Sequence, residues 1–576
     1  MRLRRWLTGF FISLLFWLVA EGLAAWPVAP ALVGDLKQGG VSAKLMDLGP
    51  GTHVLEGALH VGGWRPKSIR VSADDCLMSI VVAGKELFST PRCTFCANCS
   101  SKILQLPDLP AGIQPIKVVT QDRGGTAWVQ IGTSREVFRD VLILSSISGA
   151  LLILIGMALR IRKLLLLIVL GAQLIAIPYV LGTNPFQRDY DIEGHLQYVD
   201  ILRQSHRLPL PTRGWETYHP PAYYALGALI TSDSPTPLRD DPRLLARVQL
   251  IALASFSAAL ILTLFLIGRY RELSELHYLG LLLFGFIPGH LFFISRINND
   301  APVPLLGVAS FALAWAYEKK SRFTVALLGG VVGAIAVMVK YSALPLLGAF
   351  CLWVLFRSTG RPWIRLRNTL AAALPGAITI FLWARRSHQL AGNWMYSNAA
   401  SISGTLRIPN DFRRYFYFDL PRFLSEGGVT THSGEGRLSL WSTCLTTLLQ
   451  GGEHPVADSL LALVTFMRAS FLVLLVAIAI GLCKGWRKRT RLTSLAMLYI
   501  GVHLIFFLLF NWRQPYSSSQ DARYLGSAFF ALAIVASVGI ESALDRGSVW
   551  LRRLAQIGLL GYLPLLGIFY LSLLYL

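Results

Sequence analysis

One polar stretch of the chain concentrates side chains that can transfer protons. It runs from Arg188 to Ile230 and carries acids, histidines, a pair of prolines and several tyrosines inside a largely apolar sequence. Asp191 and His195 stand at i and i+4, so on a helix they share one face. A carboxylate and an imidazole in that relation can share a proton-transfer task or bind a metal ion. The other candidates in the stretch are Asp189, Glu193, Tyr198, His219, Tyr223 and Tyr224.

The composition places this stretch in a polytopic α-helical membrane protein. The chain has 576 residues, 54% hydrophobic and 15% charged, with a mean hydropathy of +0.52, whereas soluble domains carry about 25% charged residues. Apolar runs of about 20 residues, long enough to cross a bilayer, recur along it. The net charge of +22 does not indicate a nucleic-acid partner, because the Lys and Arg residues concentrate in short loops, where they set membrane topology.

Thirteen membrane crossings are predicted, with the N-terminus inside and the C-terminus outside. The loops expected to face the cytoplasm, such as "RIRK", "EKKSR", "RSTGRPWIRLR" and "KGWRKRTR", are all basic, as the positive-inside rule requires. The first crossing, Trp6 to Ala25, reads as an uncleaved anchor (residues 1–26) or as a cleaved signal peptide. The others are expected near 141–159, 164–182, 243–268, 277–295, 302–317, 323–339, 343–356, 368–384, 458–482, 492–511, 524–542 and 555–575.

Three further groups of polar residues are predicted at the outer ends of crossings. The positive-inside rule does not explain cations there, whereas a cation at the outer membrane edge suits the phosphate of a lipid. The alternative for each cation is a snorkelling side chain. The groups lie in "SRINNDAP", "VMVKYSALP" and "SSSQDARYLGSAFF", and their residues of interest are Arg296, Asn298, Asn299, Asp300, Lys340, Tyr341, Gln520, Asp521, Arg523 and Tyr524.

Two long stretches are predicted outside between crossings, residues 183–242 and 385–457. In the first, Pro220–Pro221 is expected to start a short helix, and Tyr223 and Tyr224 suit a membrane interface at the lip of a cavity. The second is rich in aromatic and polar residues and is read as a partly helical cover over that cavity, the alternative being an ordinary surface insertion. No internal repeat is visible, which disfavours transporter designs built from duplicated halves.

Residues 27–140 are predicted to form an extracytoplasmic antiparallel β-sandwich. Patches such as "SIRVSA", "LMSIVVAGKELFS" and "IQPIKVVTQDRGGTAWVQI" have strand composition and are separated by Gly and Pro. "SADDCLMSIVVAGKELF" resembles a hairpin of PA14-like sandwiches, which implies calcium-dependent sugar binding at Asp74 and Asp75; the alternative is that these residues cap a turn. Clustered cysteines in an oxidising compartment indicate disulfides rather than zinc, with one bridge expected from Cys76 to the loop that carries Cys93, Cys96 and Cys99.

Five motifs in order resemble the GT-C glycosyltransferases, nearest to the protein O-mannosyltransferase and ArnT-like branches. They are "D-x-E-x-H-x-x-Y", "HPPAYYALGAL", "NNDA", "KYSALPLL" and "ARYLGSAFFALAI", and they cover residues 164 to 542 of a core assigned to residues 141–576. The resemblance implies transfer of a sugar from a polyprenyl-phosphate donor to a glycan, lipid or protein acceptor on the non-cytoplasmic face. By position Asp191 is then the base, with Asp189 as second choice, because Ile192 separates Asp191 from Glu193 where the family often shows an adjacent Asp-Glu pair.

The resemblance also assigns roles to the outer cations. Lys340 and Arg523 match the positions that bind the donor phosphate, where they would stabilise the charge that develops on the leaving group. In-line attack would invert the anomeric centre, and the prenyl chain would lie in an apolar groove between helices. Some members need a divalent metal (Mg, Mn or Ca) and others do not, so a cofactor is left open, with Asp189, His195 and Asp300 as candidate ligands.

Two rival functions are weighed against glycosyl transfer. A transporter or flippase of lipid-linked sugars would need polar residues deep in several crossings, whereas the charges gather at the outer edge. A membrane-anchored assembly protein with the β-domain as its working part would leave Asp191, Lys340 and Arg523 without a role. The family resemblance favours a bacterial inner membrane with the site facing the periplasm, although charge alone does not exclude the endoplasmic reticulum.

Overall fold

The computed structural model describes much of an N-terminal region of β-strands and much of the helical region that follows it. The described residues are 31–38, 41–42, 51–61, 68–73, 76–90, 101–106, 112–122, 129–133, 191–239, 241–269, 296–358, 361–398, 407–425, 439–450, 458–485, 490–546 and 548–573, with a few single positions between them. The predictions for the crossings at 6–25 and 141–159, most of those at 164–182 and 277–295, and the residues Asp74, Asp75, Asp189, Cys93, Cys96 and Cys99 fall outside the described residues.

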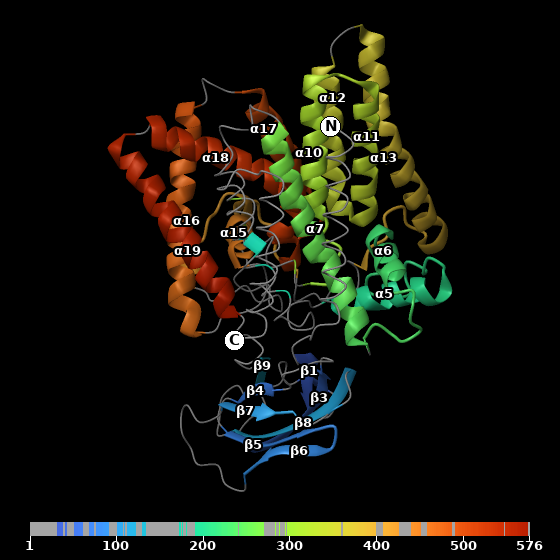
Figure 1. Ribbon diagram of the computed structural model, residues 1–576, viewed down its shortest axis with the longest axis vertical. Coiled ribbons are helices and arrows are strands. Elements are labelled where there is room, and N and C mark those ends of the chain that lie inside the picture. Colours follow the sequence, from blue (N-terminus) through green and yellow to red (C-terminus); the bar gives the residue numbers. More distant parts are fainter. Residues whose placement is uncertain are drawn as a thin grey trace.

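Two antiparallel sheets form the N-terminal part, beneath the helices in Figure 1. One has the strand order β2-β1-β3-β8-β5-β6 and the other β7-β4-β9. Buried side chains from both sheets share one core, among them Leu59 and Val118 from the first and Val71 from the second. The strands are β1 Ala31–Gln38, β2 Val41–Ser42, β3 Gly51–Val61, β4 Ser68–Ala73, β5 Cys76–Val82, β6 Lys85–Ser89, β7 Ser101–Gln105, β8 Gly112–Asp122 and β9 Val129–Thr133.

The β5–β6 hairpin shows why these residues form strands. Ile80 and Val82 alternate toward the core while the partner strand exposes charged residues, and this is the period-two pattern of a half-buried strand. Ala83 and Gly84 connect the strands with φ of 50° and 77°. Two positive φ values in a two-residue loop match the right-handed twist of the flanking strands. The three sequence patches predicted as strands coincide with β4, with β5–β6 and with β8–β9.

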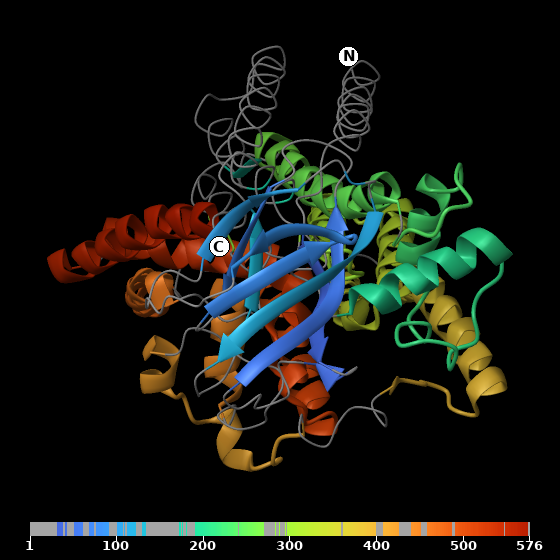
Figure 2. The same ribbon diagram turned by 90° about the horizontal axis from the view of Figure 1, so that it is seen from below.

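The rest of the described chain is mostly helical, and Figure 1 shows the helices standing above the sheets. The view from below in Figure 2 shows the sheets across the middle of the underside, with α5 to one side. The helices are α5 Ile192–Ser205, α6 Ala222–Ile230, α7 Pro242–Arg269, α10 Val303–Lys319, α11 Phe323–Val339, α12 Leu344–Arg357, α13 Pro362–Ala391, α14 Leu420–Ser425, α15 Leu440–Gln450, α16 Asp458–Gly485, α17 Arg491–Arg513, α18 Phe529–Arg546 and α19 Val549–Leu573; short 3₁₀ turns are η3 Tyr341–Ala343, η6 Phe412–Tyr415, η8 Ser517–Gln520 and η9 Ala522–Ala528.

Five helical segments of the described residues are long and apolar enough to cross a membrane, and the predicted total of thirteen stays a prediction. They are Leu244–Leu266, Pro362–Ala391, Leu461–Cys483, Arg491–Arg513 and Ser517–Leu544. The outward face of α13 exposes Leu370, Leu374, Ile378, Phe381 and Leu382. An exposed apolar face of that length is expected where a helix meets lipid rather than water. The helix runs past its predicted 368–384 at both ends.

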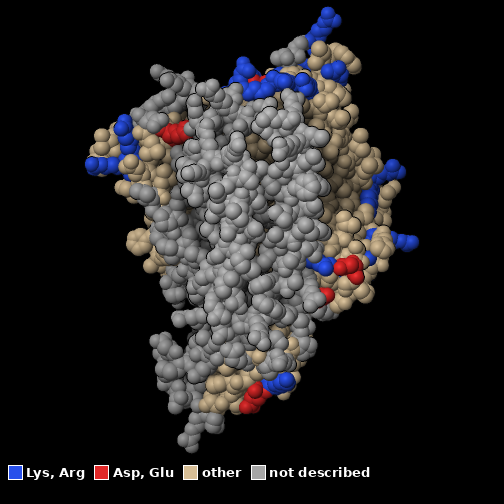
Figure 3. All heavy atoms as spheres, in the orientation of Figure 1, with Lys and Arg blue, Asp and Glu red and all other residues tan. Residues whose placement is uncertain are grey.

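The two ends of the helical part gather different residues. At one end the Glu318 carboxylate accepts from both Arg357, with Nε at 2.7 Å, and Arg491, with Nη1 at 2.9 Å. These residues belong to loops or helix ends predicted on the cytoplasmic side, and Figure 3 shows Lys and Arg gathered at the end of the molecule away from the sheets. Lys340 and Asp300 pair where the predicted outer loops lie. Loops predicted on one side of the membrane therefore meet at one end.

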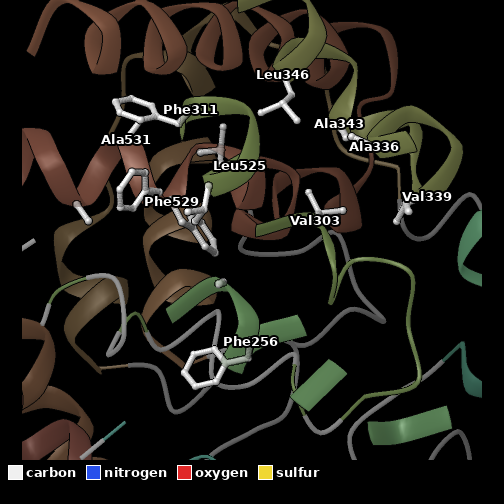
Figure 4. Close-up of a cluster of buried hydrophobic side chains, with 14 of the residues drawn as sticks. Phe256, Val303, Phe311, Ala336, Val339, Ala343, Leu346, Leu525, Phe529 and Ala531 are labelled. Carbon is white, nitrogen blue, oxygen red and sulfur yellow. The ribbon is translucent and has the colours of Figure 1, made fainter. Parts of the chain in front are cut away.

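Close packing of helices holds the outer loops in place. Figure 4 shows part of the buried cluster that joins α7, α10, α12 and α18, with Phe256, Phe311, Leu346 and Phe529. In α11, a Cβ on Gly330 would lie 2.4 Å from the carbonyl oxygen of Ala372 in α13. Small residues at such contacts let membrane helices approach closely. Because Lys340 directly follows the last residue of α11, this packing fixes the position of that cation.

Candidate functional site

Asp191 stands immediately before α5, and its carboxylate faces a neighbouring loop. It occupies the N-cap position but makes no capping hydrogen bond with its side chain. Instead its Oδ1 accepts from Trp215 Nε1 at 3.0 Å. The loop comes this close because Gly194 lies in the first turn of α5, where a Cβ would meet the Glu216 side chain at 2.8 Å. The carboxylate is therefore oriented toward residues 215–219, at a half-exposed position.

His195 lies one turn further along α5 and is buried, as is the Glu216 carboxyl beside it. His195 Nδ1 is 2.9 Å from the Tyr224 hydroxyl and 3.9 Å from Glu216 Oε2. The same Glu216 oxygen lies 2.9 Å from His219 Nε2. Glu216 is 4% exposed, so this carboxyl is shared between two imidazoles and screened from solvent.

Burial decides the protonation of these three groups. It raises the pKa of Glu216 to about 7, although the neighbouring His195 lowers it in part. It lowers the pKa of His219 to about 3, with a further contribution from Lys340. Burial also lowers the pKa of His195, against the opposing pull of Glu216 and Asp191. Near neutral pH both imidazoles are therefore uncharged, and Glu216 is balanced between its two forms.

The tyrosines of this region are interior residues, which corrects the predicted place of Tyr223 and Tyr224 at the membrane interface. Tyr198, Tyr223 and Tyr224 are 0%, 1% and 0% exposed. The rings of Tyr198 and Tyr224 stack with centroids 3.9 Å apart, and the Tyr198 hydroxyl donates to the backbone oxygen of His219 at 3.2 Å. They are buried because α6 packs directly against α5. The tyrosines thus hold the two short helices together.

Glu193 also departs from its predicted position. It was expected among the residues that line the site, but its side chain is 53% exposed and lies 3.5 Å from Arg239 Nη1. One residue beyond the helix start and two before His195, it points about 160° away from that buried side chain. Such a solvent-exposed pair contributes little to stability.

A second group of charges comes from the loops that precede α10 and follow α11. Lys340 Nζ donates to Asp300 Oδ2 at 2.5 Å, and Arg523 Nε lies 3.9 Å from the same oxygen. Burial opposes ionisation of Asp300, but Lys340 and Arg523 outweigh it and hold the pKa of this carboxyl below its usual range. One carboxylate thus faces two cations, which leaves the group with a net positive charge.

The two groups of charges are in contact. Asn299 Nδ2 donates to the Tyr224 hydroxyl at 3.3 Å, which joins the loop before α10 to α6. The charges of Lys340 and Arg523 act on Glu216, and so does that of Asp191. Segments far apart in the sequence therefore meet in one cluster, which we call the outer cluster: Asp191, His195, Glu216, His219, Tyr224, Asn299, Asp300, Lys340 and Arg523.

The remaining predicted residues lie around this cluster. Arg296 is 3% exposed in the loop before α10, and Tyr341 is half-buried at the start of η3, directly after Lys340. The Tyr524 ring lies beneath Lys340 Nζ, 5.8 Å from its centroid, and beneath the Arg523 guanidinium at 5.3 Å. Aromatic faces at such distances attract cations.

No group of three or more His, Cys, Asp or Glu side chains among the described residues is arranged to hold a metal ion. Of the candidate ligands, His195 Nδ1 faces the Tyr224 hydroxyl and Asp300 is paired with Lys340. Asp189 lies outside the described residues.

Glu216 is the residue that sequence reasoning missed. It lies in "WETYHPP", inside the opening stretch, three positions before His219. That spacing was a usable signal, because groups at i and i+3 can meet on one turn. Its neighbour Trp215, which holds Asp191, was missed as well. Neither the burial of Glu216 nor the contact of Trp215 follows from local sequence, since both depend on how the loop folds over α5.

Part of the second outer stretch contacts the first. Arg386, near the end of α13, donates from Nη2 to the backbone oxygen of Pro209 at 2.6 Å. Asn398 donates to the backbone oxygen of Trp215. Residues 386–398 thus hold the loop that carries Trp215, the partner of Asp191, and this contact is compatible with the prediction that the second stretch covers the cavity.

Comparisons with known proteins found similarity to solved structures alone. No protein-family model matches it, and no curated protein matches it. Among solved structures, the apo oligosaccharyltransferase of Archaeoglobus fulgidus matches at 12% identity with a TM-score of 0.38, covering 70% of this chain and 56% of that chain. The same organism's AglB in complex with an inhibitory peptide and a dolichol-phosphate matches at 10% identity and 0.38, covering 72% and 56%.

The arabinosyltransferase EmbB of Mycobacterium smegmatis matches at 13% identity with a TM-score of 0.32, covering 94% of this chain and 53% of that chain. The chain therefore spans about half the length of the solved structures it matches.

Proposed function

We propose that the protein is a membrane glycosyltransferase that moves a sugar from a polyprenyl-phosphate donor to a hydroxyl acceptor on the non-cytoplasmic face. The observation that carries this proposal is the outer cluster itself. Asp191, a half-exposed carboxylate held by Trp215, and the cations Lys340 and Arg523 all act on the same buried Glu216. Glycosyl transfer needs a base for the acceptor and cations for the leaving phosphate, and these groups supply both.

The proposed reaction follows from those charges. Asp191 takes the proton from the acceptor hydroxyl as its oxygen attacks the anomeric carbon of the donor. The bond from that carbon to the phosphate oxygen breaks, and the electron pair leaves with the phosphate. Lys340 and Arg523 stabilise the negative charge that grows there. Attack from the face opposite the phosphate inverts the anomeric centre.

Trp215 and Glu216 act as positioning residues in this proposal. The indole N–H of Trp215 fixes one oxygen of Asp191 and so orients the carboxylate. Glu216 holds the 215–219 loop against α5 through His195 and His219. Orientation of a catalytic group to within a fraction of an ångström is worth large factors in rate.

The test uses the purified full-length protein in lipid nanodiscs. Sugar transfer or donor hydrolysis is measured with polyprenyl-phosphate sugars that carry a radiolabel, for the natural protein and for Asp191→Asn. We expect the substitution to lower the rate by at least about a hundredfold, with the unfolding midpoint unchanged because Asp191 is half-exposed. Full activity of Asp191→Asn would refute its role as the base. Movement of intact donor between leaflets, without cleavage, would favour the flippase instead.

A further inference from the structure

Three buried side-chain atoms of the outer cluster that can accept hydrogen bonds have no hydrogen-bond partner in the described part of the chain. They are Asn299 Oδ1, Asp300 Oδ1 and His219 Nδ1. Asn299 is 1% exposed and Asp300 4% exposed, so bulk water does not satisfy them. Buried polar atoms are almost always hydrogen-bonded. Several unsatisfied atoms within one cluster therefore indicate that a ligand group is missing from this place.

Each of these side chains is fixed at its other end. Asn299 donates from Nδ2 to the Tyr224 hydroxyl at 3.3 Å. Asp300 holds Lys340 with Oδ2 at 2.5 Å. His219 Nε2 lies 2.9 Å from Glu216 Oε2. The unsatisfied atoms are therefore the far ends of side chains that cannot turn to find another partner without breaking these contacts.

The unsatisfied atoms share one chemical character. An amide oxygen and a carboxylate oxygen only accept hydrogen bonds. When Glu216 is ionised, a neutral His219 donates to it from Nε2, and its Nδ1 is then an acceptor too. His219 and Asp300 also interact electrostatically, so the three atoms belong to one region. The ligand group that complements them carries several hydrogen-bond donors and no negative charge of its own.

We propose that these atoms form the subsite that binds the hydroxyl groups of the donor sugar, and that this sugar is neutral and polyhydroxylated. The inference rests on the proposed function. Asp300 connects the proposed sugar subsite with the proposed phosphate site. Its Oδ2 faces the cations assigned to the phosphate, while its Oδ1 is one of the unsatisfied atoms. A sugar is joined directly to its phosphate, so a donor whose phosphate lies at Lys340 brings its hydroxyls to the same loop.

The experiment compares two kinds of lipid on the full-length protein in nanodiscs. One is undecaprenyl phosphate alone, and the others are undecaprenyl phosphates that carry mannose, glucose, galactose or arabinose. Dissociation constants are measured for the natural protein and for Asn299→Leu, which keeps the side-chain size but removes the amide. The matched control is Asn410→Leu, at an exposed asparagine outside the cluster.

We expect at least one sugar-bearing lipid to bind the natural protein about tenfold more tightly than undecaprenyl phosphate does. Asn299→Leu should remove that increment and leave the affinity for undecaprenyl phosphate unchanged, while Asn410→Leu should keep both. Equal affinity of the natural protein for all these lipids, or an increment that survives in Asn299→Leu, would overturn the subsite and leave ordered water as the partner of these atoms. Failure of every lipid, undecaprenyl phosphate included, would instead defeat the proposed function.

A second measurement needs no substitution and so is independent of folding. The best-binding sugar is replaced by its single-deoxy analogues and by the corresponding uronic acid. A site built to accept from hydroxyls strongly disfavours analogues that lack them, and a carboxylate offers no hydrogen-bond donor to Asp300 Oδ1. Loss of about tenfold or more in affinity for at least one deoxy analogue and for the uronic acid is expected. Unchanged affinity for all of them would contradict the proposal.

Discussion

At the scale of single residues, burial sets the chemistry of the outer cluster more than charge does. Glu216 lies between two imidazoles, yet both imidazoles are held neutral, so neither supplies a fixed positive charge to the carboxyl. Lys340, in contrast, has an internal counter-ion in Asp300. The cation that the sequence analysis assigned to a ligand is therefore already paired within the chain, and it is only 7% exposed.

Glu216→Gln should change how stability depends on pH. The pKa of Glu216 is raised from 4.5 to about 7 in the folded protein, so the folded state binds this proton more tightly than the unfolded state. The associated stability is fully present below pH 4.5 and is lost as the pH rises through 7. As the pH rises from 4.5 to 7, we expect the free energy of unfolding of the variant to increase by about 3 kcal/mol relative to that of the natural protein. Unfolding midpoints measured across this pH range test the expectation. A difference that does not vary with pH would contradict the assignment.

Lys340→Met should destabilise the protein as well as weaken donor binding. Removal of one partner of a buried pair leaves Asp300 with Arg523 alone at 3.9 Å, and such losses cost about 3 kcal/mol or more. The double variant Lys340→Met with Asp300→Asn removes both charges and should recover most of the stability. If Lys340 binds the donor phosphate, affinity for undecaprenyl phosphate stays low in the double variant. Recovery of affinity together with stability would show that Lys340 has only a structural role.

At the scale of elements, the outer cluster depends on how closely α11 approaches its neighbours. Gly329, Gly330 and Gly333 lie on α11 where a Cβ would meet Phe350, Ala372 or Leu347 at less than 3 Å. These contacts bring α12 and α13 against α11 and fix the helix end that carries Lys340. Apolar burial alone would allow the helices to rotate or slide, whereas glycine contacts of this kind permit only one arrangement.

Gly330→Val should therefore lower stability and donor affinity together. The added side chain would meet the backbone oxygen of Ala372, which cannot move aside as a side chain can, and overpacking typically costs about 1–3 kcal/mol. The matched control is Gly501→Ala in α17, where a Cβ would meet nothing within 4 Å. Thermal unfolding in nanodiscs measures both variants. Equal unfolding midpoints for the two would contradict the packing argument.

At the scale of the whole molecule, the two ends of the helical part are chemically distinct. Glu318 gathers Arg357 and Arg491 at one end, and the outer cluster occupies the other. Loops predicted on opposite sides of a membrane are separated in this way in the structure. Which end faces the cytoplasm follows from the positive-inside rule, and we propose that the Glu318 end does.

Site-directed labelling tests this orientation. Cys483 is an exposed free cysteine at the end of α16 that leads into a basic loop, and Asn410 is exposed on the predicted outer side. In variants that carry a single cysteine, either Cys483 or Asn410→Cys, a membrane-impermeant maleimide added to intact cells should label only the second. Inverted vesicles should reverse the result. Labelling of Cys483 from the cell exterior would invert the proposed topology and place the outer cluster in the cytoplasm.

The sequence by itself determined the features that depend on local composition. Runs of apolar residues gave α7, α10, α11, α12, α16 and α17 close to their predicted bounds, because their burial or lipid exposure follows from hydropathy alone. The alternation of apolar and polar residues likewise predicted the strands on either side of the Ala83–Gly84 turn, because the burial of one strand face also follows from hydropathy. The motif order also selected Asp191, Lys340 and Arg523 as residues to consider together.

Only the tertiary structure decided how those residues are used. The burial of Glu216, the pairing of Asp300 with Lys340 and the outward turn of Glu193 depend on contacts between segments that the chain brings together from far apart. Hydropathy does not predict such contacts, because the sequence alone does not show whether a carboxylate will meet a cation, an imidazole or water. Its pKa and its role are set by the neighbours that folding supplies.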